Sequence, residues 1–536
     1  MIMRKFIYFP ALVAICLLAT CCKPAQPHAD HVILLGFDAM SALGIQRAET
    51  PNMNHMIENG AVSVHTRCVR ETASSQNWMS MVSASPIELH GVFNNGWKPG
   101  DSDNLPPALE NGIGLYPTIF DHIRSQKPQL RQHAFIEWAG ETRMYDMSAF
   151  DKAVICGVTE GVKDYKDVIE GAFADYLENR PEFMFLSMDI TDHMGHLKGH
   201  ESDGYFDCVH EMDGYIGDFV KELEARGWMK NTVIIITADH GGLGPVHGGD
   251  TMAEFETPIL IYGKGVTKGQ VMKHVNMIYD VGATVAALLG VELPVECRGK
   301  FLAEAFGPRN EGEYVPVPMV RPYAGKADGE VSISCDKEGA EIHYTIDGTE
   351  PTADSPKYEK PFKLDASAEV RAVAFKGGSK SIETRNYLYT GVQEPPVSYK
   401  LYRNVTSADM PDFTKFGRPD ESGYVDTFGF DDLKKLEDET YFAVLFSSNL
   451  NISKAGTYWF SLEANHGALM FIDGELFIDC RNGYNIPPIE KSIELSEGKH
   501  FIRIEYRRTD RRLQLDLFWK GTAGKYTPII PDVLDR

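Results

Sequence analysis

The sequence predicts an α/β domain with a mostly parallel sheet between helices, followed by two all-β sandwich domains. Short, nearly continuous apolar runs alternate with amphipathic stretches over residues 31–310, as expected for buried parallel strands joined by helices. From residue 322 onward the pattern changes to alternating strands with Gly turn signals. Two Pro-containing joints, residues 311–321 and 394–397, separate the three parts.

Size and composition agree with several folded domains. The 536 residues predict three or four domains, and 43% hydrophobic with 24% charged residues excludes a disordered or fibrous chain. The net charge of −23 argues against nucleic acid binding, because a DNA- or RNA-binding chain is normally basic. Nine Cys are too few for a disulfide scaffold, so isolated thiols are expected, with a single disulfide as the alternative in an oxidising compartment.

The N-terminus predicts an export signal over residues 1–22. Arg4 and Lys5 precede an apolar stretch over residues 6–18, which is shorter than a membrane span. The residues before Cys21 resemble a bacterial lipobox, which makes Cys21 the expected lipid-anchored first residue; Cys22 or ordinary signal cleavage is the alternative. We therefore expect an exported periplasmic, outer-membrane or cell-surface lipoprotein that meets the membrane only through its anchor.

The α/β part contains five strand candidates and five helix candidates. The strands are expected at residues 31–38, 134–138, 182–189, 232–239 and 258–263. The helices are expected at residues 52–58, 75–83, 164–179, 204–226 and 279–289. Ligand sites of such sheets lie beyond the carboxyl ends of the strands, which selects Asp38 and residues 189–196 and 239–247.

The β-rich parts are expected at residues 322–392 and 396–536. In the first, strand patterns at residues 330–336, 340–348 and 368–378 contain Asp-Gly and Gly-Gly turn signals. In the second, strand patterns cover residues 441–452, 456–464, 468–479, 499–507 and 513–519. Asp473-Gly474 within the third of these predicts a hairpin turn.

Acidic and imidazole side chains follow three of the predicted strands. They are Asp38, Asp192, His196, Asp239, His240 and His247. Mixed Asp and His ligands suit Zn²⁺, with Mn²⁺ or Mg²⁺ as the alternatives. Two such clusters at neighbouring strand ends can hold two ions about 4 Å apart. At this spacing the two ions can bind the attacking and the leaving oxygen of a displacement at phosphorus.

Ser74 lies where a helix is expected to begin. A Ser at this position is most often only a helix cap. The same position faces backbone N–H groups and the positive end of the helix dipole, which attract a phosphoryl group. A metal ion touching the hydroxyl would lower its pKa and make it a nucleophile.

These motifs together resemble the alkaline phosphatase superfamily, and within it the type I phosphodiesterase/nucleotide pyrophosphatase branch, over residues 31–306. The resemblance implies an alkaline-phosphatase-like fold and a double displacement through a phosphoserine. It implies that Asn95 contacts a phosphoryl oxygen, with an ordinary turn residue as the alternative. The ligands that it implies are Asp38, Ser74, Asp239 and His240 for one ion and Asp192, His196 and His247 for the other.

The chain departs from the family at two positions that bear on the substrate. Nucleotide pyrophosphatases carry a base-stacking aromatic residue after the nucleophile, and this chain has Ser75 there, which argues against a nucleotide substrate. His200 replaces a Pro common in the family, and we expect it to contact substrate or to be exposed. Trp78, Trp97 and Trp138 are expected to line a pocket or to belong to the core.

The β-rich parts resemble two modules of glycan-active proteins. Residues 339–352 resemble the chitobiase/β-hexosaminidase C-terminal domain, an immunoglobulin-type sandwich that is often a spacer. Residues 396–536 resemble the protective-antigen-type β-sandwich, which implies carbohydrate contact. Sugar-binding members use paired Asp residues with Ca²⁺ where this chain has Asn465-His466-Gly467, so Ca²⁺-dependent sugar binding is not expected, and Asp473 is expected to be a turn residue.

The sequence therefore predicts an exported two-metal phosphoric ester hydrolase with Ser74 as nucleophile, acting on a glycan- or lipid-linked phosphate ester. A phosphodiesterase is favoured because the sequence shows no clear set of positively charged side chains that would bind a dianionic monoester. Arg67, Arg70 and Lys198 are the candidates for such a role. The alternatives are a phosphomonoesterase or nucleotide pyrophosphatase of the same superfamily. A glycan-binding surface protein with a degenerate catalytic domain is the alternative from another class.

Overall fold

The structure is a computed structural model of the 536-residue chain. It describes residues 27–536 apart from 101–104, 201, 245, 323, 324, 328, 391–393, 408, 438, 465, 466, 482–487, 510–512 and 522–525. The expected leader with Cys21 and the residues Asn465 and His466 lie outside the described part of the chain.

The N-terminal domain is built on an eight-stranded sheet in the order β4-β3-β5-β1-β6-β7-β2-β8. Five neighbouring strands, from β4 to β6, are parallel, while β7 is antiparallel to both β6 and β2. The prediction of a mostly parallel sheet is confirmed. The strands are β1 (His31–Phe37), β2 (Ala61–Arg67), β3 (Gln132–Ile136), β4 (Lys152–Ile155), β5 (Phe183–Met188), β6 (Thr232–Thr237), β7 (Glu256–Gly263) and β8 (Gln270–Val271).

Continuous apolar sequence places the central strands between two cores. In β1, Val32 and Leu34 face one core, while Ile33 and Leu35 face the other, and all four side chains are fully buried. Successive side chains of a strand point to opposite faces, so both faces of β1 must be covered by helices. This explains why an unbroken apolar run, rather than an alternating one, marks these strands.

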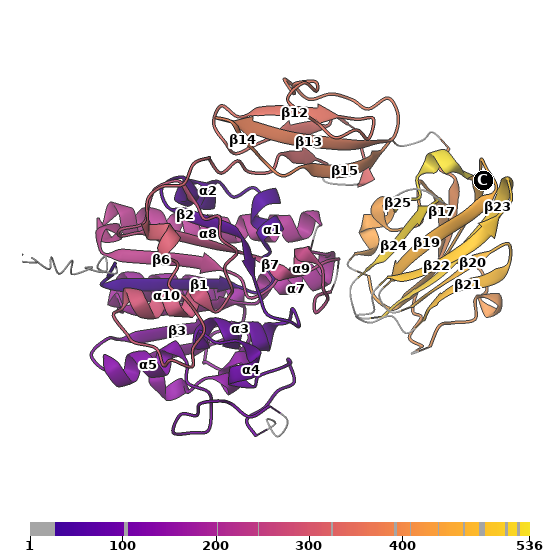
Figure 1. The fold of residues 1–536 in the computed structure, drawn as a ribbon. Helices are drawn as coiled ribbons and strands as arrows, with labels where there is room; N and C mark the ends of the chain where they lie inside the picture. Colours follow the sequence, from indigo (N-terminus) through magenta and orange to yellow (C-terminus); the bar gives the residue numbers. More distant parts are fainter. Residues whose placement is uncertain are drawn as a thin grey trace, which may run out of the picture.

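Helices cover both faces of the sheet (Figure 1). One face packs against α3, α5 and α10, and the other against α1, α2, α6 and α8. The bounds are α1 (Ala42–Arg47), α2 (Pro51–Glu58), α3 (Ser74–Ser83), α4 (Ile87–His90), α5 (Ile119–Gln126), α6 (Tyr165–Asn179), α7 (Ile190–Lys198), α8 (Asp203–Ala225), α9 (Met252–Phe255), α10 (Asp280–Leu288) and the 3₁₀ segment η2 (Ala139–Met144). Helix α7, which follows β5, is not predicted by the sequence pattern.

The middle part, from residue 319 onward, forms a small β domain above α2 (Figure 1). Its larger sheet has the order β10-β15-β13-β12, with β14 paired to β13, and β9 pairs with β11. The strands are β9 (Met319–Arg321), β10 (Gly325–Lys326), β11 (Ser332–Ser334), β12 (Glu341–Thr345), β13 (Ala368–Lys376), β14 (Ser379–Lys380) and β15 (Thr384–Tyr389).

The C-terminal part is a sandwich of a seven-stranded and a four-stranded sheet around one apolar core. Asp473 and Gly474 both have positive φ, 50° and 88°, as a two-residue hairpin turn requires. The strands are β16 (Val397–Tyr402), β17 (Glu421–Val425), β18 (Phe442–Ile452), β19 (Gly456–Ala464), β20 (Ala468–Ile472), β21 (Glu475–Cys480), β22 (Ile489–Leu495), β23 (Gly498–Arg508), β24 (Leu515–Lys520), β25 (Thr527–Pro528) and β26 (Leu534–Asp535).

Ion pairs join the three parts. Lys337 of the middle domain pairs with Glu58 at the end of α2, with Nζ 3.0 Å from Oε1. Lys198 at the end of α7 pairs with Glu437 of the C-terminal sandwich at 3.3 Å. The sandwich therefore lies against the helix that carries Asp192 and His196, on the side of α7 and α9 seen in Figure 1.

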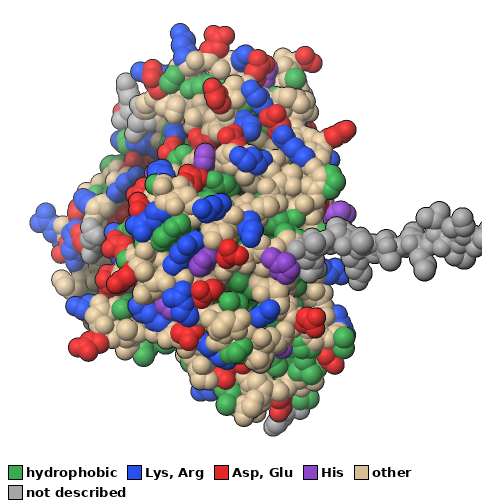
Figure 2. Space-filling view, turned by 90° about the vertical axis from the view of Figure 1, so that its left-hand side faces the viewer, with side chains coloured by type: hydrophobic (Ala, Val, Ile, Leu, Met, Phe, Trp, Pro, Cys, Tyr) green, Lys and Arg blue, Asp and Glu red, His purple; other side chains and the backbone are tan. Residues whose placement is uncertain are grey.

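One face of the molecule and the thiols of the described residues complete the description of the fold. On the face turned away from the sandwich, acidic and basic side chains are interspersed rather than gathered by sign (Figure 2). Among the described residues, no helix is long and apolar enough to cross a membrane. The six Cys of the described ranges are unpaired thiols.

Candidate metal centre and nucleophile

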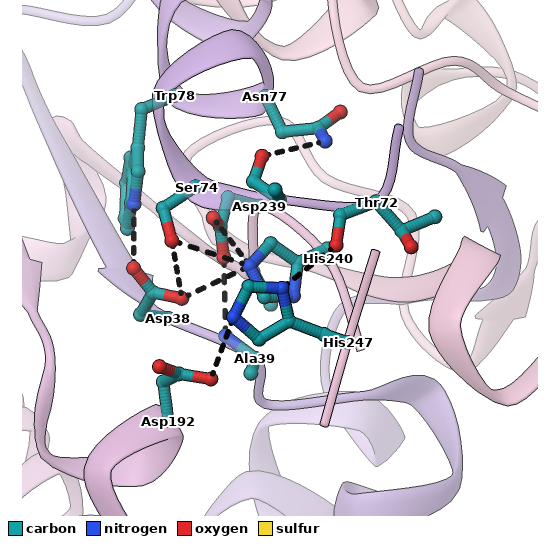
Figure 3. Close-up of polar contacts among 12 residues, drawn as sticks. Asp38, Ala39, Thr72, Ser74, Asn77, Trp78, Asp192, Asp239, His240 and His247 are labelled. Atoms are coloured by element: carbon teal, nitrogen blue, oxygen red, sulfur yellow. Dashed lines mark hydrogen bonds and ion pairs between the residues drawn. The ribbon is translucent and has the colours of Figure 1, made fainter. Parts of the chain in front are cut away.

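The predicted ligands come from three neighbouring strand ends. Asp38 follows β1, and Asp239 and His240 follow β6, its neighbour in the sheet. Asp192 lies in the first turn of α7, directly after β5 on the other side of β1. Because parallel strands end at the same edge of a sheet, these side chains converge there (Figure 3).

Asp38, Asp239 and His240 form the first group, with ligand atoms within 4.8 Å of one another. His240 Nε2 lies 3.3 Å from Asp38 Oδ1 and 3.4 Å from Asp239 Oδ2. All three side chains are fully buried or nearly so. Trp78 donates its indole N–H to Asp38 Oδ2 at 3.0 Å and so fixes the orientation of that carboxylate.

Ser74 is the first residue of α3, and its hydroxyl faces this group (Figure 3). Its Oγ lies 3.3 Å from His240 Nε2 and 3.5 Å from Asp38 Oδ1. The helix cap is Ala73, which makes no side-chain cap bond, so the interpretation of Ser74 as a cap is wrong. The hydroxyl is thus directed at the candidate metal ligands and not at the helix backbone.

Asn77 holds the segment that leads to Ser74. Its Oδ1 accepts the Val69 backbone N–H at 2.7 Å, and its Nδ2 donates to Val69, Glu71 and Ala73 carbonyls at 2.9–3.3 Å. Asn77 is fully buried. One side chain one turn beyond Ser74 therefore fixes the loop before it.

Asp192 and His247 form the second group together with His240, again with ligand atoms within 4.8 Å. His247 Nε2 lies 3.7 Å from Asp192 Oδ1, and its Nδ1 lies 3.0 Å from the Thr72 carbonyl oxygen. His196 Nε2 lies 3.1 Å from Asp192 Oδ2 but belongs to neither group. The structure thus brings all six Asp and His candidates together with Ser74 at one edge of the sheet.

Burial shifts the pKa values of the ionisable side chains at this edge of the sheet. Burial, and then the nearby carboxylates, raise the pKa of Asp38 well above its usual range. Burial likewise raises the pKa of Asp239, and burial lowers the pKa of His240. Burial opposes ionisation of Asp192, but hydrogen bonds from His196 and His200 hold its pKa well below the usual value.

The donor set fits a divalent cation. The buried Asp239 Oδ2 has no hydrogen-bond partner among the described residues. His240 Nδ1 lies 2.7 Å from the Gly241 carbonyl, which accepts only, so the ring lone pair is on Nε2 and points at two carboxylate oxygens. An ion between these atoms would satisfy all of them.

Arg143 is a cation near the nucleophile that the sequence pattern did not indicate. From η2, its Nη2 donates to Ser75 Oγ at 2.8 Å and to the Asn95 carbonyl at 2.6 Å. Asn95 accepts the Ser75 backbone N–H through Oδ1 at 2.8 Å and is exposed. Asn95 thus lies at the N-terminus of α3, next to Ser74.

The structure also places the other sequence candidates. The rings of Trp78 and Trp97 belong to the core, and the indole N–H of Trp78 contacts Asp38. Arg70 is exposed and pairs with Asp250 at 2.9 Å, and Lys198 pairs with Glu437. The expectation that His200 is exposed is wrong, because its side chain is fully buried beside Asp192.

Comparison with protein families gives three matches along the chain. Residues 32–259 match the type I phosphodiesterase/nucleotide pyrophosphatase family. Residues 322–386 match the chitobiase/β-hexosaminidase C-terminal domain, and residues 410–532 match the PA14 domain. In the structure the C-terminal sandwich begins earlier than the last match, because β16 pairs with β18.

Individual relatives share only part of the chain. Phosphopentomutase of Desulfitobacterium hafniense is 32% identical over 152 residues, which are 28% of this chain and 37% of that protein. Ectonucleotide pyrophosphatase/phosphodiesterase family member 7 of Mus musculus is 25% identical over 237 residues, 43% of this chain and 54% of that protein. The chain thus spans about half or less of these relatives.

Among solved structures, murine ectonucleotide pyrophosphatase/phosphodiesterase 5 has a TM-score of 0.42 and 15% identity, covering 49% of this chain and 96% of that one. The family matches, together with the mostly parallel sheet and the convergence of Asp and His residues at its edge, identify the N-terminal part. The findings therefore support a catalytic domain of the alkaline phosphatase superfamily that is similar to the type I phosphodiesterase/nucleotide pyrophosphatase family over residues 32–259, followed by two C-terminal β domains.

Proposed function

We propose that this protein is a two-metal phosphodiesterase that works through a phosphoserine on Ser74. The observation that carries the proposal is the position of the Ser74 hydroxyl, 3.3 Å from His240 Nε2 and 3.5 Å from Asp38 Oδ1 at the N-terminus of α3. Zn²⁺ is the expected metal, because the donor set mixes carboxylates with imidazoles. When bound, the ions would neutralise charge on phosphorus oxygens and favour the alkoxide of Ser74.

The residues divide into distinct tasks. Asp38, Asp239 and His240 would hold the ion beside Ser74, and Asp192, His196 and His247 would hold the second. Ser74 Oγ attacks phosphorus, the P–O bond to the leaving group breaks, and the proton lost by Ser74 is balanced by the proton that the leaving alkoxide takes up to become the alcohol. Water then attacks the phosphoserine and releases the serine hydroxyl, so that one water is consumed for each ester cleaved.

Two further groups are placed to stabilise phosphoryl charge. Asn95 is anchored through its Oδ1, so its Nδ2 is the end of the amide that can donate to a phosphoryl oxygen. The N-terminus of α3 adds the positive end of a helix dipole. Thr72 and Ser75 are weaker candidates for the nucleophile, because Thr72 Oγ1 donates to Gly249 and Ser75 Oγ accepts from Arg143.

Arg143 favours a second candidate function, phosphomonoesterase activity. A guanidinium next to the helix N-terminus can pair with the additional charge of a dianionic monoester. Ser75, which replaces the base-stacking aromatic residue of the family, argues against a nucleotide substrate. A glycan- or lipid-linked phosphate ester agrees with the two attached β modules and with the sandwich lying against α7.

Export and lipid anchoring at Cys21 are part of this proposal and rest on residues 1–22 alone. Incorporation of labelled palmitate that is lost in Cys21→Ser would support the anchor. Unchanged labelling would rule out Cys21 as the modified residue.

The decisive experiment compares zinc-loaded wild type with Ser74→Ala. Hydrolysis of bis-p-nitrophenyl phosphate should fall by a factor on the order of 10³ or more in Ser74→Ala, while Ser83→Ala, at the other end of α3, serves as the control. p-Nitrophenyl phosphate and p-nitrophenyl sulfate as parallel substrates define the class of ester. A Ser74→Ala variant that keeps wild-type turnover, or a wild type that binds zinc without hydrolysing any ester, would refute the proposal.

A further inference from the structure

Asp192 is surrounded by three imidazoles, of which the family resemblance explains only two. Its carboxylate oxygens lie 3.1 Å from His196 Nε2, 3.7 Å from His247 Nε2 and 3.4 Å from His200 Nε2. Ligand atoms on one tetrahedral zinc ion are about 3.3–3.5 Å apart, as follows from bond lengths of about 2.0–2.2 Å. The distance to His200 thus falls within the range expected for two ligands of one ion.

His200 is oriented like the neighbouring candidate ligands. Its Nδ1 lies 2.8 Å from the Gly244 carbonyl oxygen, as Nδ1 of His240 and His247 lie against the carbonyls of Gly241 and Thr72. A carbonyl only accepts, so Nδ1 carries a proton and Nε2 is the ring nitrogen that faces Asp192. A backbone carbonyl that fixes the tautomer in this way is typical of metal-bound imidazoles.

His200 Nε2 faces the same carboxylate as the other two imidazoles. It lies 3.4 Å from Asp192 Oδ1, and the His200 side chain has no exposed surface. An ion bound to Asp192 would therefore lie within reach of Nε2, which would coordinate it in place of this hydrogen bond.

Two glycines pack against the His200 ring. A Cβ added at Gly195 would lie 2.1 Å from His200 Nε2, and a Cβ added at Gly242 would lie 2.4 Å from His200 Cγ. Gly195 belongs to α7 and Gly242 to the segment after β6. Each of the two segments that carry metal-ligand candidates therefore has a glycine, without a side chain, where it contacts the His200 imidazole.

We infer that His200 is an additional ligand of the ion held by Asp192, His196 and His247. This inference rests on the proposed two-metal function and adds a nitrogen donor to the second site. The site would then bind Zn²⁺ more tightly, and would be more selective for Zn²⁺ over Mg²⁺, than a site with one carboxylate and two imidazoles.

The test compares wild type, His200→Asn and, as the matched control, His193→Asn. His193 lies next to Asp192 on α7 but is exposed. Zinc content and zinc retention against a competing chelator should show two ions in wild type and in His193→Asn. In His200→Asn the affinity of one of the two ions should fall by about tenfold or more.

A second readout separates a ligand from a residue that acts only on Asp192. In the Co²⁺-substituted protein, each coordinated imidazole gives a strongly shifted ring N–H proton resonance. His200→Asn should lose one such resonance that His193→Asn retains. If all resonances remain, His200 is not a ligand, even if the affinity falls.

Folding and the proposed function are checked in the same samples. The metal-free thermal unfolding of His200→Asn should lie close to that of wild type, and His200→Gln replaces it if the Asn variant does not fold. A wild type that binds fewer than two zinc ions contradicts the proposed function itself. A wild type with two ions, and a His200 variant with the same affinity and the same resonances, contradicts this inference alone.

Discussion

Glu141 provides a prediction whose magnitude can be worked out from the structure. It lies in η2, two residues before Arg143, is fully buried, and is hydrogen-bonded to the Ser187 hydroxyl and, at 3.0 Å, to the Tyr145 hydroxyl. Burial raises its pKa from 4.5 to about 8. The acid form is therefore favoured in the folded protein at neutral pH, and the substitution Glu141→Gln keeps a neutral group of the same shape.

The direction of the pH dependence follows from the raised pKa. A group whose pKa is higher in the folded than in the unfolded state stabilises the fold below its unfolded value, and this contribution is lost as the pH rises towards the folded value. The loss is about 1.36 kcal/mol for each pH unit in that window. For Glu141 it amounts to about 2–3 kcal/mol between pH 5.5 and pH 7.5.

Urea unfolding of the zinc-saturated protein at these two pH values tests this prediction. The free energy of unfolding of Glu141→Gln, relative to wild type, should rise by about 2–3 kcal/mol from pH 5.5 to pH 7.5. Contributions of the other domains and of the metal cancel in this difference. Glu160→Gln, at an exposed position, controls for the substitution itself. A difference that is the same at both pH values would refute the assignment of Glu141 as a buried acid.

Three other substitutions test the site. Asn77→Ala should destabilise the catalytic domain by about 2–4 kcal/mol, because it leaves several buried backbone groups unpaired; urea unfolding measures this. Arg143→Gln should lower kcat/KM for p-nitrophenyl phosphate about tenfold more than for bis-p-nitrophenyl phosphate, because a charge-assisted contact near Ser75 is worth about 1.5–3 kcal/mol to the extra charge of the monoester. Trp78→Phe should weaken zinc retention about tenfold, because it removes the indole donor to Asp38.

Each of these has a clear contrary result. An Asn77→Ala variant as stable as wild type would mean that the loop before Ser74 is held by other contacts. Equal losses for monoester and diester in Arg143→Gln would assign Arg143 a structural role only. Unchanged zinc retention in Trp78→Phe, measured beside the exposed-site control His193→Asn, would show that the Asp38 carboxylate keeps its orientation without the indole.

Local sequence patterns account for most of the architecture of the catalytic domain. Burial on both faces requires unbroken apolar runs, and these appear at β1, β5 and β6 within one or two residues of the predicted bounds. Other elements of this domain were not predicted, namely β2, β4, β8, α1, α4, α5, α7 and α9. The short α7 is too polar on one face to resemble a buried helix, and the antiparallel direction of β7 depends on its partners β6 and β2 and not on its own residues.

The sequence by itself determined the fold class, the turn at Asp473 and the kinds of side chain that follow the strands. The spacing of apolar residues, the preferred φ of a turn residue and the ligand chemistry of a side chain are all properties of local residues. The tertiary structure alone decided which side chains meet. Arg143 reaches Ser75 across 68 positions, Asp192 meets His247, and His200 is buried between two glycine-containing segments. These contacts join residues distant in the chain, so no local pattern carries them.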